Sequence, residues 1–298
     1  MGTHLTLAYE HVGLRAVDTG RHNLSPFVKW AGGKRSILRD LLHYVPPQLP
    51  NYYEPFLGGA ALYLGICKRT TQFRALLSDT NKELIEAYWV IKEAPEKLIS
   101  SLSVLQKEYY DSSNKGEYYY RKRSWQPRSH VESATRLIFL NKTCYNGLYR
   151  VNSKGQFNVP FGNYKRPLIA NSETIRSLSN ALRATNAQVA CLDYKEAIES
   201  CGVGDFVYFD PPYNPTSKTS SFTDYTPSGF SQDNQRELAV AFSKLASRGC
   251  HVLLSNSDTP LIRELYRDFP LKSIRVPRPI NSVGGGRTGF KELIVFSG

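Results

Sequence analysis

The sequence predicts an α/β fold in which a mostly parallel sheet, covered by helices, is interrupted by an inserted helical domain. Short apolar runs rich in β-branched and aromatic residues, such as residues 206–209, are typical of buried strands. Two glycine pairs, Gly32-Gly33 and Gly58-Gly59, each precede a segment of helical character. A strand, a glycine-rich turn and a helix form the architecture that holds nucleotide-like cofactors.

Length and composition set the domain plan. The chain has 298 residues, 41% of them hydrophobic and 12% aromatic, which is enough for a substantial core. No apolar run approaches the length of a membrane helix, and the N-terminus lacks a signal-peptide core. We expect an N-terminal extension over residues 1–24, a sheet domain over 25–81 and 171–298, and an inserted domain over 82–170.

Cysteine and histidine usage argues against a metal site. The five cysteines are odd in number and none has metal-ligand spacing, while the six histidines are scattered. Reduced, mostly buried thiols in a cytoplasmic protein are the expected state. We therefore expect no metal and no membrane association.

The positive charge is concentrated in one segment. The net charge is +12, and residues 115–170 alone hold eleven Lys and Arg against two Glu, a net of +9. These charges interleave with Tyr, Trp and Phe, which suits a phosphate backbone and unstacked bases. A solvated basic face is the alternative.

The first third of the chain contains two candidate ligand loops. Residues 34–42 can begin a helix whose N-terminus attracts anions, although an ordinary turn with surface lysines fits too. A strand from Tyr52 runs into the second glycine pair and a helix over 60–67. The apolar run 75–78 ends in Asp79, which could bind ribose hydroxyls or cap the helix that begins near Lys82.

The inserted segment predicts helices and a hairpin. Amphipathic patterns over 82–94 and 96–110 are separated by Pro95, and a third helix is expected over 131–143. Residues 152–155 form a turn signal between two short β-like runs, and a two-stranded ribbon can enter the major groove of DNA. On these residues alone, only Arg150 is a plausible base reader.

The motif Asp210-Pro211-Pro212-Tyr213 follows the buried strand at 206–209. Consecutive prolines cannot donate ladder hydrogen bonds, so the strand must end there. A carboxylate, two rigid carbonyls and an aromatic ring then lie at the carboxyl end of a strand, where open α/β sheets bind ligands. An exocyclic amine can donate to the carboxylate and to a proline carbonyl while its ring stacks on Tyr213. The alternative is a polar loop after a core strand.

The remaining segments complete the sheet domain. We expect a helix around 175–182, a strand over 187–192 that ends at Asp193, a Ser/Thr/Gly-rich loop over 216–229 and a helix over 232–246. A strand at 251–255, a helix start at Pro260 and a hairpin of 273–276 with 292–296 follow. Asp193 could border a cofactor or cap the next helix. The glycine-rich tip at 284–287 is expected to be a solvated loop, in which Arg287 could touch a phosphate.

The order of these motifs resembles that of Dam-type DNA N6-adenine methyltransferases of the D12 class. The resemblance rests on residues 29–34, the Glu54-Pro55-Phe56 segment with its glycine pair, Asp79 and the motif at 210–213, and it runs from about Pro26 to the C-terminus. It implies a Rossmann-like sheet, S-adenosyl-L-methionine as cofactor, double-stranded DNA as partner and a monomer. The catalytic residues would be Asp210, Pro211, Pro212 and Tyr213.

The resemblance also implies cofactor and DNA contacts. The cofactor contacts would be Trp30, Lys34, Gly58, Asp79, Asp193 and Asp210. Residues 141–162 resemble the recognition hairpin of enzymes that methylate adenine in GATC by base flipping. By position, Tyr145 would wedge into the base stack and Asn146 would lie by the vacated base. The base readers would be Leu148 and Pro160 on a thymine methyl, and Arg150 and Lys29 on guanines.

Three alternatives remain. The chain could be an adenine methyltransferase of a restriction-modification system with another target, or a DNA-binding protein that has lost catalysis. A protein-glutamine methyltransferase is disfavoured, because related enzymes of that kind carry Asn where this chain has Asp210.

Overall fold

The computed structural model describes residues 24–214, 230–276 and 290–297. The expectations for residues 1–23, for the loop at 216–229 and for the tip at 284–287 lie outside these residues.

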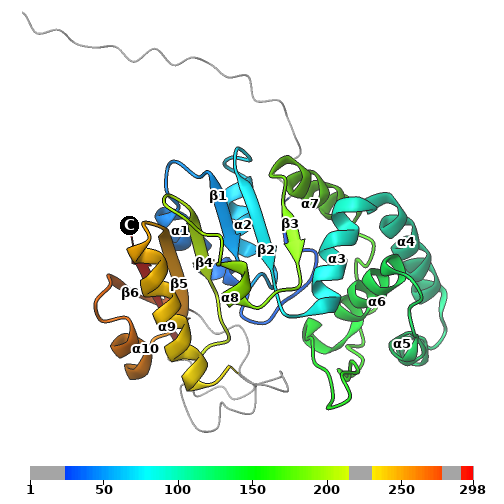
Figure 1. Ribbon diagram of the computed structural model, residues 1–298. Helices are drawn as coiled ribbons and strands as arrows, with labels where there is room; N and C mark the ends of the chain where they lie inside the picture. Colours follow the sequence, from blue (N-terminus) through cyan, green and yellow to red (C-terminus); the bar gives the residue numbers. More distant parts are fainter. Residues whose placement is uncertain (1–23, 215–229, 277–289, 298) are drawn as a thin grey trace, which may run out of the picture.

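Within the described ranges, seven strands form one sheet in the order β3-β2-β1-β4-β5-β7-β6 (Figure 1). Strands β1 to β5 are parallel to one another, and β7 is antiparallel to both β5 and β6. This arrangement confirms the predicted α/β fold. The strands are β1 (Asn51–Glu54), β2 (Arg74–Ser78), β3 (Gln188–Ala190), β4 (Phe206–Phe209), β5 (His251–Ser257), β6 (Leu271–Val276) and β7 (Phe290–Ser297).

The strand order places a crevice between β1 and β4. The chain leaves β1 toward β2 on one side and leaves β4 toward β5 on the other. Ligands of open α/β sheets bind outside the carboxyl ends of the strands at such a switch point. The residues that follow β1, β2 and β4 therefore face a common site.

Alternate residues of β4 enter two different cores. Phe206 and Tyr208 pack in one core, and Val207 and Phe209 pack in the other. This period of two is the pattern of a strand buried on both faces. The first core includes side chains of α1 (Leu38–Leu41), α2 (Ala61–Cys67) and α7 (Ser172–Ala184), and the second those of α8 (Tyr194–Ala197), α9 (Gln232–Ser247) and α10 (Pro260–Leu265).

The inserted helices lie beyond the β3 edge of the sheet (Figure 1). They are α3 (Lys82–Glu93), α4 (Pro95–Asp111), α5 (Lys115–Ser124) and α6 (His130–Thr143). The expected helices at 82–94, 96–110 and 131–143 are confirmed, and Pro95 occupies the first turn of α4, where its missing N–H costs nothing. Helix α5, capped by the Asn114 side chain, was not expected.

Two local predictions need correction. Residues 34–42 do not form one helix but the 3-10 turn η2 (Lys34–Ser36), helix α1 and the 3-10 turn η3 (Leu42–Tyr44). Buried Ile37, with φ −114° and ψ 7°, separates η2 from α1, so no long helix N-terminus is available to an anion. The hairpin is also shorter than a regular ribbon. It follows the turn η4 (Tyr145–Gly147) and is closed by two isolated antiparallel bridges, Val151–Phe157 and Cys144–Phe161.

Most cysteine side chains are buried, as the sequence predicted. Four of the five cysteines are buried, and Cys191 is exposed. No helix in the described part of the chain is long and apolar enough to cross a membrane.

Candidate active site

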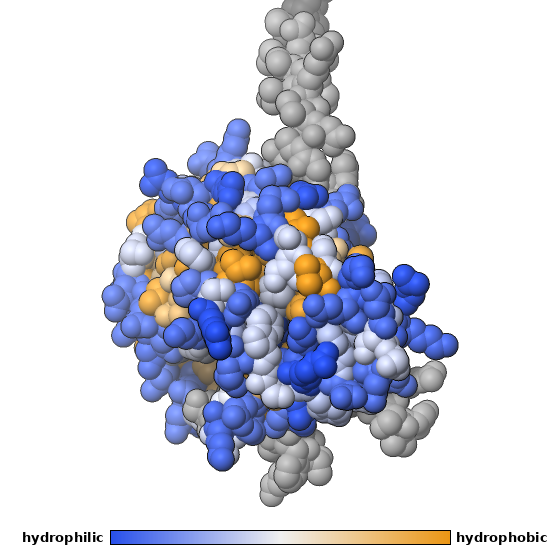
Figure 2. Space-filling model, turned by 90° about the vertical axis from the view of Figure 1, so that its right-hand side faces the viewer, coloured by the Kyte–Doolittle hydropathy of each residue, from blue (hydrophilic) through white to orange (hydrophobic). Residues whose placement is uncertain are grey.

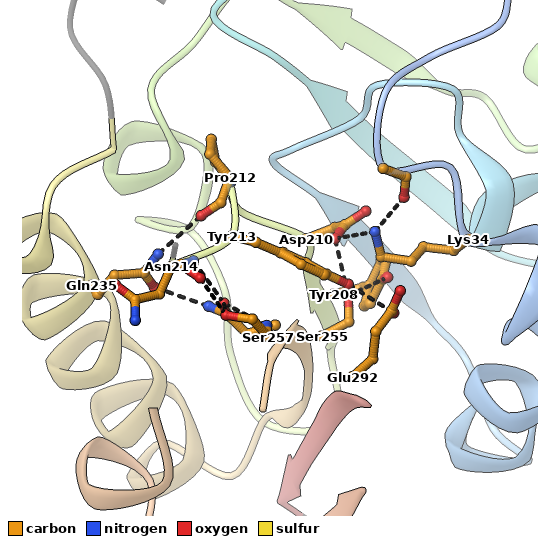
Figure 3. Close-up of polar contacts among 12 residues, drawn as sticks. Lys34, Tyr208, Asp210, Pro212, Tyr213, Asn214, Gln235, Ser255, Ser257 and Glu292 are labelled. Atoms are coloured by element: carbon orange, nitrogen blue, oxygen red, sulfur yellow. Dashed lines mark hydrogen bonds and ion pairs between the residues drawn. The ribbon is translucent and has the colours of Figure 1, made fainter. Parts of the chain in front are cut away.

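Asp210 follows β4 and forms an ion pair with Lys34 of the first glycine loop. Lys34 Nζ lies 2.8 Å from Asp210 Oδ1, and the Lys34 side chain is 3% exposed. Ser255 Oγ of β5 donates to the same carboxylate oxygen at 3.0 Å (Figure 3). Burial raises the pKa of Asp210, and the ammonium and the hydroxyl counteract that rise in part. The sheet thus holds an acceptor carboxylate at the expected crevice.

Tyr213 lies beside this ion pair. Its ring centroid is 4.6 Å from Lys34 Nζ, and its hydroxyl donates to Glu292 Oε2 of β7 at 2.8 Å (Figure 3). Burial raises the pKa of Tyr213 well above its usual range, so the phenol stays protonated and remains a donor. Burial likewise raises the pKa of Glu292. The hydroxyl and the cation fix the plane of the ring.

A second group of hydrogen bonds holds the backbone of the motif. Gln235 Nε2 of α9 donates to the Pro212 carbonyl at 2.9 Å, and Asn256 Nδ2 donates to Gln235 Oε1 at 2.9 Å. Ser257 Oγ donates to the Asn214 carbonyl at 2.7 Å. Figure 3 shows this group on the side of the motif away from Lys34. The Asp-Pro-Pro-Tyr turn is therefore anchored on both sides.

The second glycine turn lies against Asp79 and Trp30. The Gly58 N–H donates to Asp79 Oδ2 at 3.0 Å. Gly58 has φ +44°, and a Cβ at this position would lie 2.7 Å from Trp30 Cδ1, so only glycine fits. Asp79 Oδ1 accepts from the Asn81 N–H at 2.9 Å, and burial raises the pKa of Asp79. The alternative in which Asp79 caps α3 is wrong, because the Asn81 side chain is the cap.

These residues suit S-adenosyl-L-methionine. Asp79 and Lys34 carry charges of opposite sign, and the Trp30 indole, which lies over Gly58 and stacks on Tyr149, borders the turn. Asp193 is exposed at the end of β3, and its carboxylate caps α8 in a capping box with Glu196. That observation supports the cap, and the cofactor role of Asp193 stays a prediction.

The turn η4 is bound through Asn141 to Lys29, which precedes the first glycine pair. Asn141 Oδ1 accepts from the Lys29 N–H at 2.8 Å, and its Nδ2 donates to the carbonyls of Lys29 at 2.9 Å and Gly147 at 3.0 Å. A Cβ at Gly147 would lie 2.6 Å from Lys29 Cδ. Trp30 also stacks on Tyr149, with ring centroids 5.2 Å apart. The structure thus places Lys29 beside the hairpin, and its contact with a guanine stays a prediction.

The turn exposes the side chains expected to meet DNA. Tyr145 is 54% exposed and Leu148 is 39% exposed, so both side chains are open to a partner. Asn146 adopts the left-handed region at φ +56°. The Tyr145 N–H donates to the Pro160 carbonyl at 2.8 Å, so the two parts of the predicted reader lie together.

Arg150 lies across the hairpin from Asn158. Its Nε donates to Asn158 Oδ1 at 2.6 Å and its Nη2 to the Asn158 carbonyl at 3.3 Å. These bonds hold the guanidinium against Asn158, and the base-reading role of Arg150 stays a prediction.

The match to a protein family decides the class. Residues 30–279 match the family described as D12 class N6 adenine-specific DNA methyltransferase. The chain belongs to this family.

Some of its relatives are named Type II methyltransferases, and others are named DNA adenine methylases. The methyltransferase is 42% identical to Type II methyltransferase M1.LlaDCHI of Lactococcus lactis subsp. cremoris, covering 95% of this chain and 98% of the relative. It is 39% identical to Type II methyltransferase M.MjaIII of Methanocaldococcus jannaschii, covering 92% and 99%. It is 35% identical to the DNA adenine methylase of Escherichia coli (strain K12), covering 90% and 93%.

Four polar residues of the methyltransferase's site were not expected. Glu54 is 2% exposed and accepts from Tyr52 OH at 2.8 Å, and burial raises its pKa to about 8. Glu54 belongs to a motif that carried no assigned role. Ser255, Gln235 and Glu292 sit on segments where the sequence shows only a strand or helix pattern. Nothing in their spacing relates them to Asp210.

The surface of the methyltransferase's insert is mainly hydrophilic. Figure 2 shows this side of the molecule, where only scattered hydrophobic patches interrupt the polar surface. Cations also lie over aromatic rings here, as Arg123 does over Tyr120 at 4.7 Å. Such a surface fits a charged partner better than an apolar one. Among the described residues, no group of three or more His, Cys, Asp or Glu could hold a metal ion.

Proposed function

We propose that this protein is a site-specific DNA adenine methyltransferase that transfers a methyl group from S-adenosyl-L-methionine to adenine N6 within GATC. Members of the family generally use this cofactor. When bound, S-adenosyl-L-methionine supplies an electrophilic methyl group on a sulfonium. The observation that carries the proposal is the position of Asp210 at the end of β4, where it forms an ion pair with Lys34, whose Nζ also lies over the Tyr213 ring.

The residues of the motif would act by positioning and electrostatics. The adenine amine is a poor nucleophile because its lone pair delocalises into the ring. Hydrogen bonds from its two protons to the Asp210 carboxylate and the Pro211 carbonyl would favour a pyramidal nitrogen. Stacking on Tyr213 would hold the ring in the same place. This role requires an ionised Asp210, which the Lys34 ammonium favours.

The cofactor would be held by the two glycine loops. We assign contacts to Trp30 and Gly58, with Lys34 and Asp79 for the charged and hydroxyl groups. Asp193 and Asp210 complete the proposed set. The hydrogen bond from the Gly58 N–H to Asp79 Oδ2 supports placing these two residues in one site.

Target recognition would require the adenine to leave the duplex, at a cost of about a few kcal/mol. Exposed Tyr145 would fill the space in the base stack, with Asn146 beside it. Leu148 and Pro160 would contact a thymine methyl, and Arg150 and Lys29 would read guanines. The inserted domain, residues 82–170, would act as the DNA-binding unit of a monomer that works on DNA in the cytoplasm.

The relatives named Type II methyltransferases favour a second candidate, a modification enzyme of a restriction-modification system. Its chemistry would be the same, and its target could differ. Transfer of labelled methyl to duplexes with GATC and with singly substituted sites tests both. Transfer confined to GATC supports the first candidate, and transfer to another sequence supports the second. No transfer to any duplex would contradict both.

A further inference from the structure

Both hydrogen-bond donors found on the Asp210 carboxylate reach the same oxygen. Lys34 Nζ lies 2.8 Å from Oδ1, and Ser255 Oγ donates to Oδ1 at 3.0 Å. In the described part of the chain, no hydrogen bond to Oδ2 is found. An ionised carboxylate has acceptor sites on both oxygens, so two donors on one oxygen fix its rotation and leave the other for a ligand.

The Ser255 hydroxyl is itself held by Tyr208. The Tyr208 hydroxyl lies 2.8 Å from Ser255 Oγ. Serine has one proton, which Ser255 gives to Asp210, so Tyr208 must donate to Ser255. Burial raises the pKa of Tyr208 well above its usual range, and the phenol stays protonated. The result is a chain of fixed direction, Tyr208 OH to Ser255 Oγ to Asp210 Oδ1 (Figure 3).

Tyr208 and Ser255, which form this series of hydrogen bonds, both lie on strands of the sheet. Tyr208 is 1% exposed and Ser255 is 0% exposed. They stand on the neighbouring parallel strands β4 and β5, where Tyr208 pairs with Leu253 and Phe209 with Leu254. Side chains on packed strands hold a geometry more tightly than side chains on loops.

We propose that Ser255, oriented by Tyr208, is a positioning residue that turns Asp210 Oδ2 toward the amine of the target adenine. The inference rests on the proposed catalytic role of Asp210. It adds a residue pair that acts through Asp210 without touching the substrate. Removing either hydroxyl should free the carboxylate to rotate and weaken the ionised form.

Other charged groups face the same carboxylate. Lys34 of η2 is bound to it, and Glu54 of β1 and Glu292 of β7 repel it. The charge of Asp210 also helps to raise the pKa of Tyr213. The Ser255 hydroxyl bonds to Asp210. The rate should fall on the acid side as Asp210 takes up a proton. If the pH of this fall changes when Ser255 is substituted, the change is therefore assigned to the pKa of Asp210.

The test compares Ser255→Ala and Tyr208→Phe with wild type and with Ser243→Ala, which removes a serine hydroxyl from α9 that bonds only to a helix carbonyl. Single-turnover rates are measured across acidic and neutral pH, together with KM for the duplex. We expect Ser255→Ala to lower the rate about tenfold or more at neutral pH, with KM for the duplex little changed. Its acid limb should shift upward by on the order of one pH unit.

Tyr208→Phe keeps the ring and should shift the limb in the same direction by less, so it decides the matter if Ser255→Ala does not fold. Ser243→Ala should match wild type. Equal rates and an unmoved limb in both test variants would overturn the proposal, as would a loss of the same size at every pH. Asp210→Asn separates this failure from failure of the proposed function. If that variant stays active, the catalytic role of Asp210 itself is wrong.

Discussion

Lys34 Nζ lies 2.8 Å from Asp210 Oδ1, which ties the first glycine loop to the end of β4. The pair is largely buried, with 3% and 20% of the two side chains exposed. A buried carboxylate without a counter-charge takes up a proton more readily. The ammonium therefore favours the ionised form of Asp210.

Lys34→Met should reduce methyl transfer about tenfold or more at neutral pH. Under the proposed function the ionised form of Asp210 is the active one, and the pKa of Asp210 is already raised by burial. Losing the ammonium raises that pKa further, so the acid limb of the rate profile should move to higher pH. The measurement is the rate across pH at saturating cofactor. The control is Lys272→Met, which removes an ion pair with Asp40 whose lysine is 45% exposed and should change nothing.

Asp79→Ala should weaken cofactor binding while the fold persists. Its carboxylate accepts from the Gly58 and Asn81 N–H groups, and the loss of a charged hydrogen bond to a cofactor hydroxyl would cost about 1.5–3 kcal/mol. Calorimetry should show cofactor affinity reduced by roughly tenfold or more. Asn81→Ala is the matched control, because it loses the α3 cap and should cost ~1 kcal/mol of stability with cofactor affinity retained. Unchanged affinity in Asp79→Ala would remove Asp79 from the cofactor site.

Gly147→Ala should impair DNA recognition, and Gly155→Ala should not. Both glycines have positive φ, +66° and +71°, so both substitutions carry a similar backbone cost of about 1 kcal/mol. A Cβ at Gly147 would lie 2.6 Å from Lys29 Cδ, whereas a Cβ at Gly155 meets nothing within 4 Å. Competition binding with GATC and non-specific duplexes measures the difference. Equal losses in the two variants would show that the contact with Lys29 does not matter.

Arg150→Ala should keep methylating but lose preference at one base pair of the target. A bidentate contact between Arg and guanine is worth about 1–3 kcal/mol of discrimination. A phosphate contact would instead weaken binding to all sequences and reduce the salt slope by about one. The measurement is kcat/KM on GATC and on each singly substituted site at two salt concentrations. Lys154→Ala, on the exposed turn, is the comparison. If Arg150→Ala slows every site equally, Arg150 is a backbone contact.

The sequence predicts the structure best where a charged residue directly follows a short apolar strand. The apolar runs before Asp79 and Asp210 are short and bounded, so strands β2 and β4 could be placed and their ends assigned to one crevice. Helix α5 was missed because its residues, Lys115–Ser124, are basic and aromatic and show no regular apolar spacing. The break at Ile37 depends on how that side chain packs, which the local pattern does not reveal.

The supporting residues of the site depend on strand register. Ser255 reaches Asp210 because β5 lies parallel to β4, and Glu292 reaches Tyr213 because β7 is inserted antiparallel beside β5. Neither pairing has a signal in the chain. Asn141 likewise joins Lys29 to Gly147 through bonds between distant segments. Motifs thus located the loops proposed for catalysis and cofactor binding, and tertiary structure was needed to show what holds them.

The most direct test of the central claim is labelled methyl transfer to a GATC duplex by the wild type and by Asp210→Asn, followed by mapping of the modified base. Asn is close in size but lacks the charge, so the fold and most DNA affinity should remain. We predict label on adenine N6 within GATC for the wild type, and a rate lower by about 100-fold or more for Asp210→Asn. Label on another base, or an Asp210→Asn rate within about tenfold of wild type, would contradict the account.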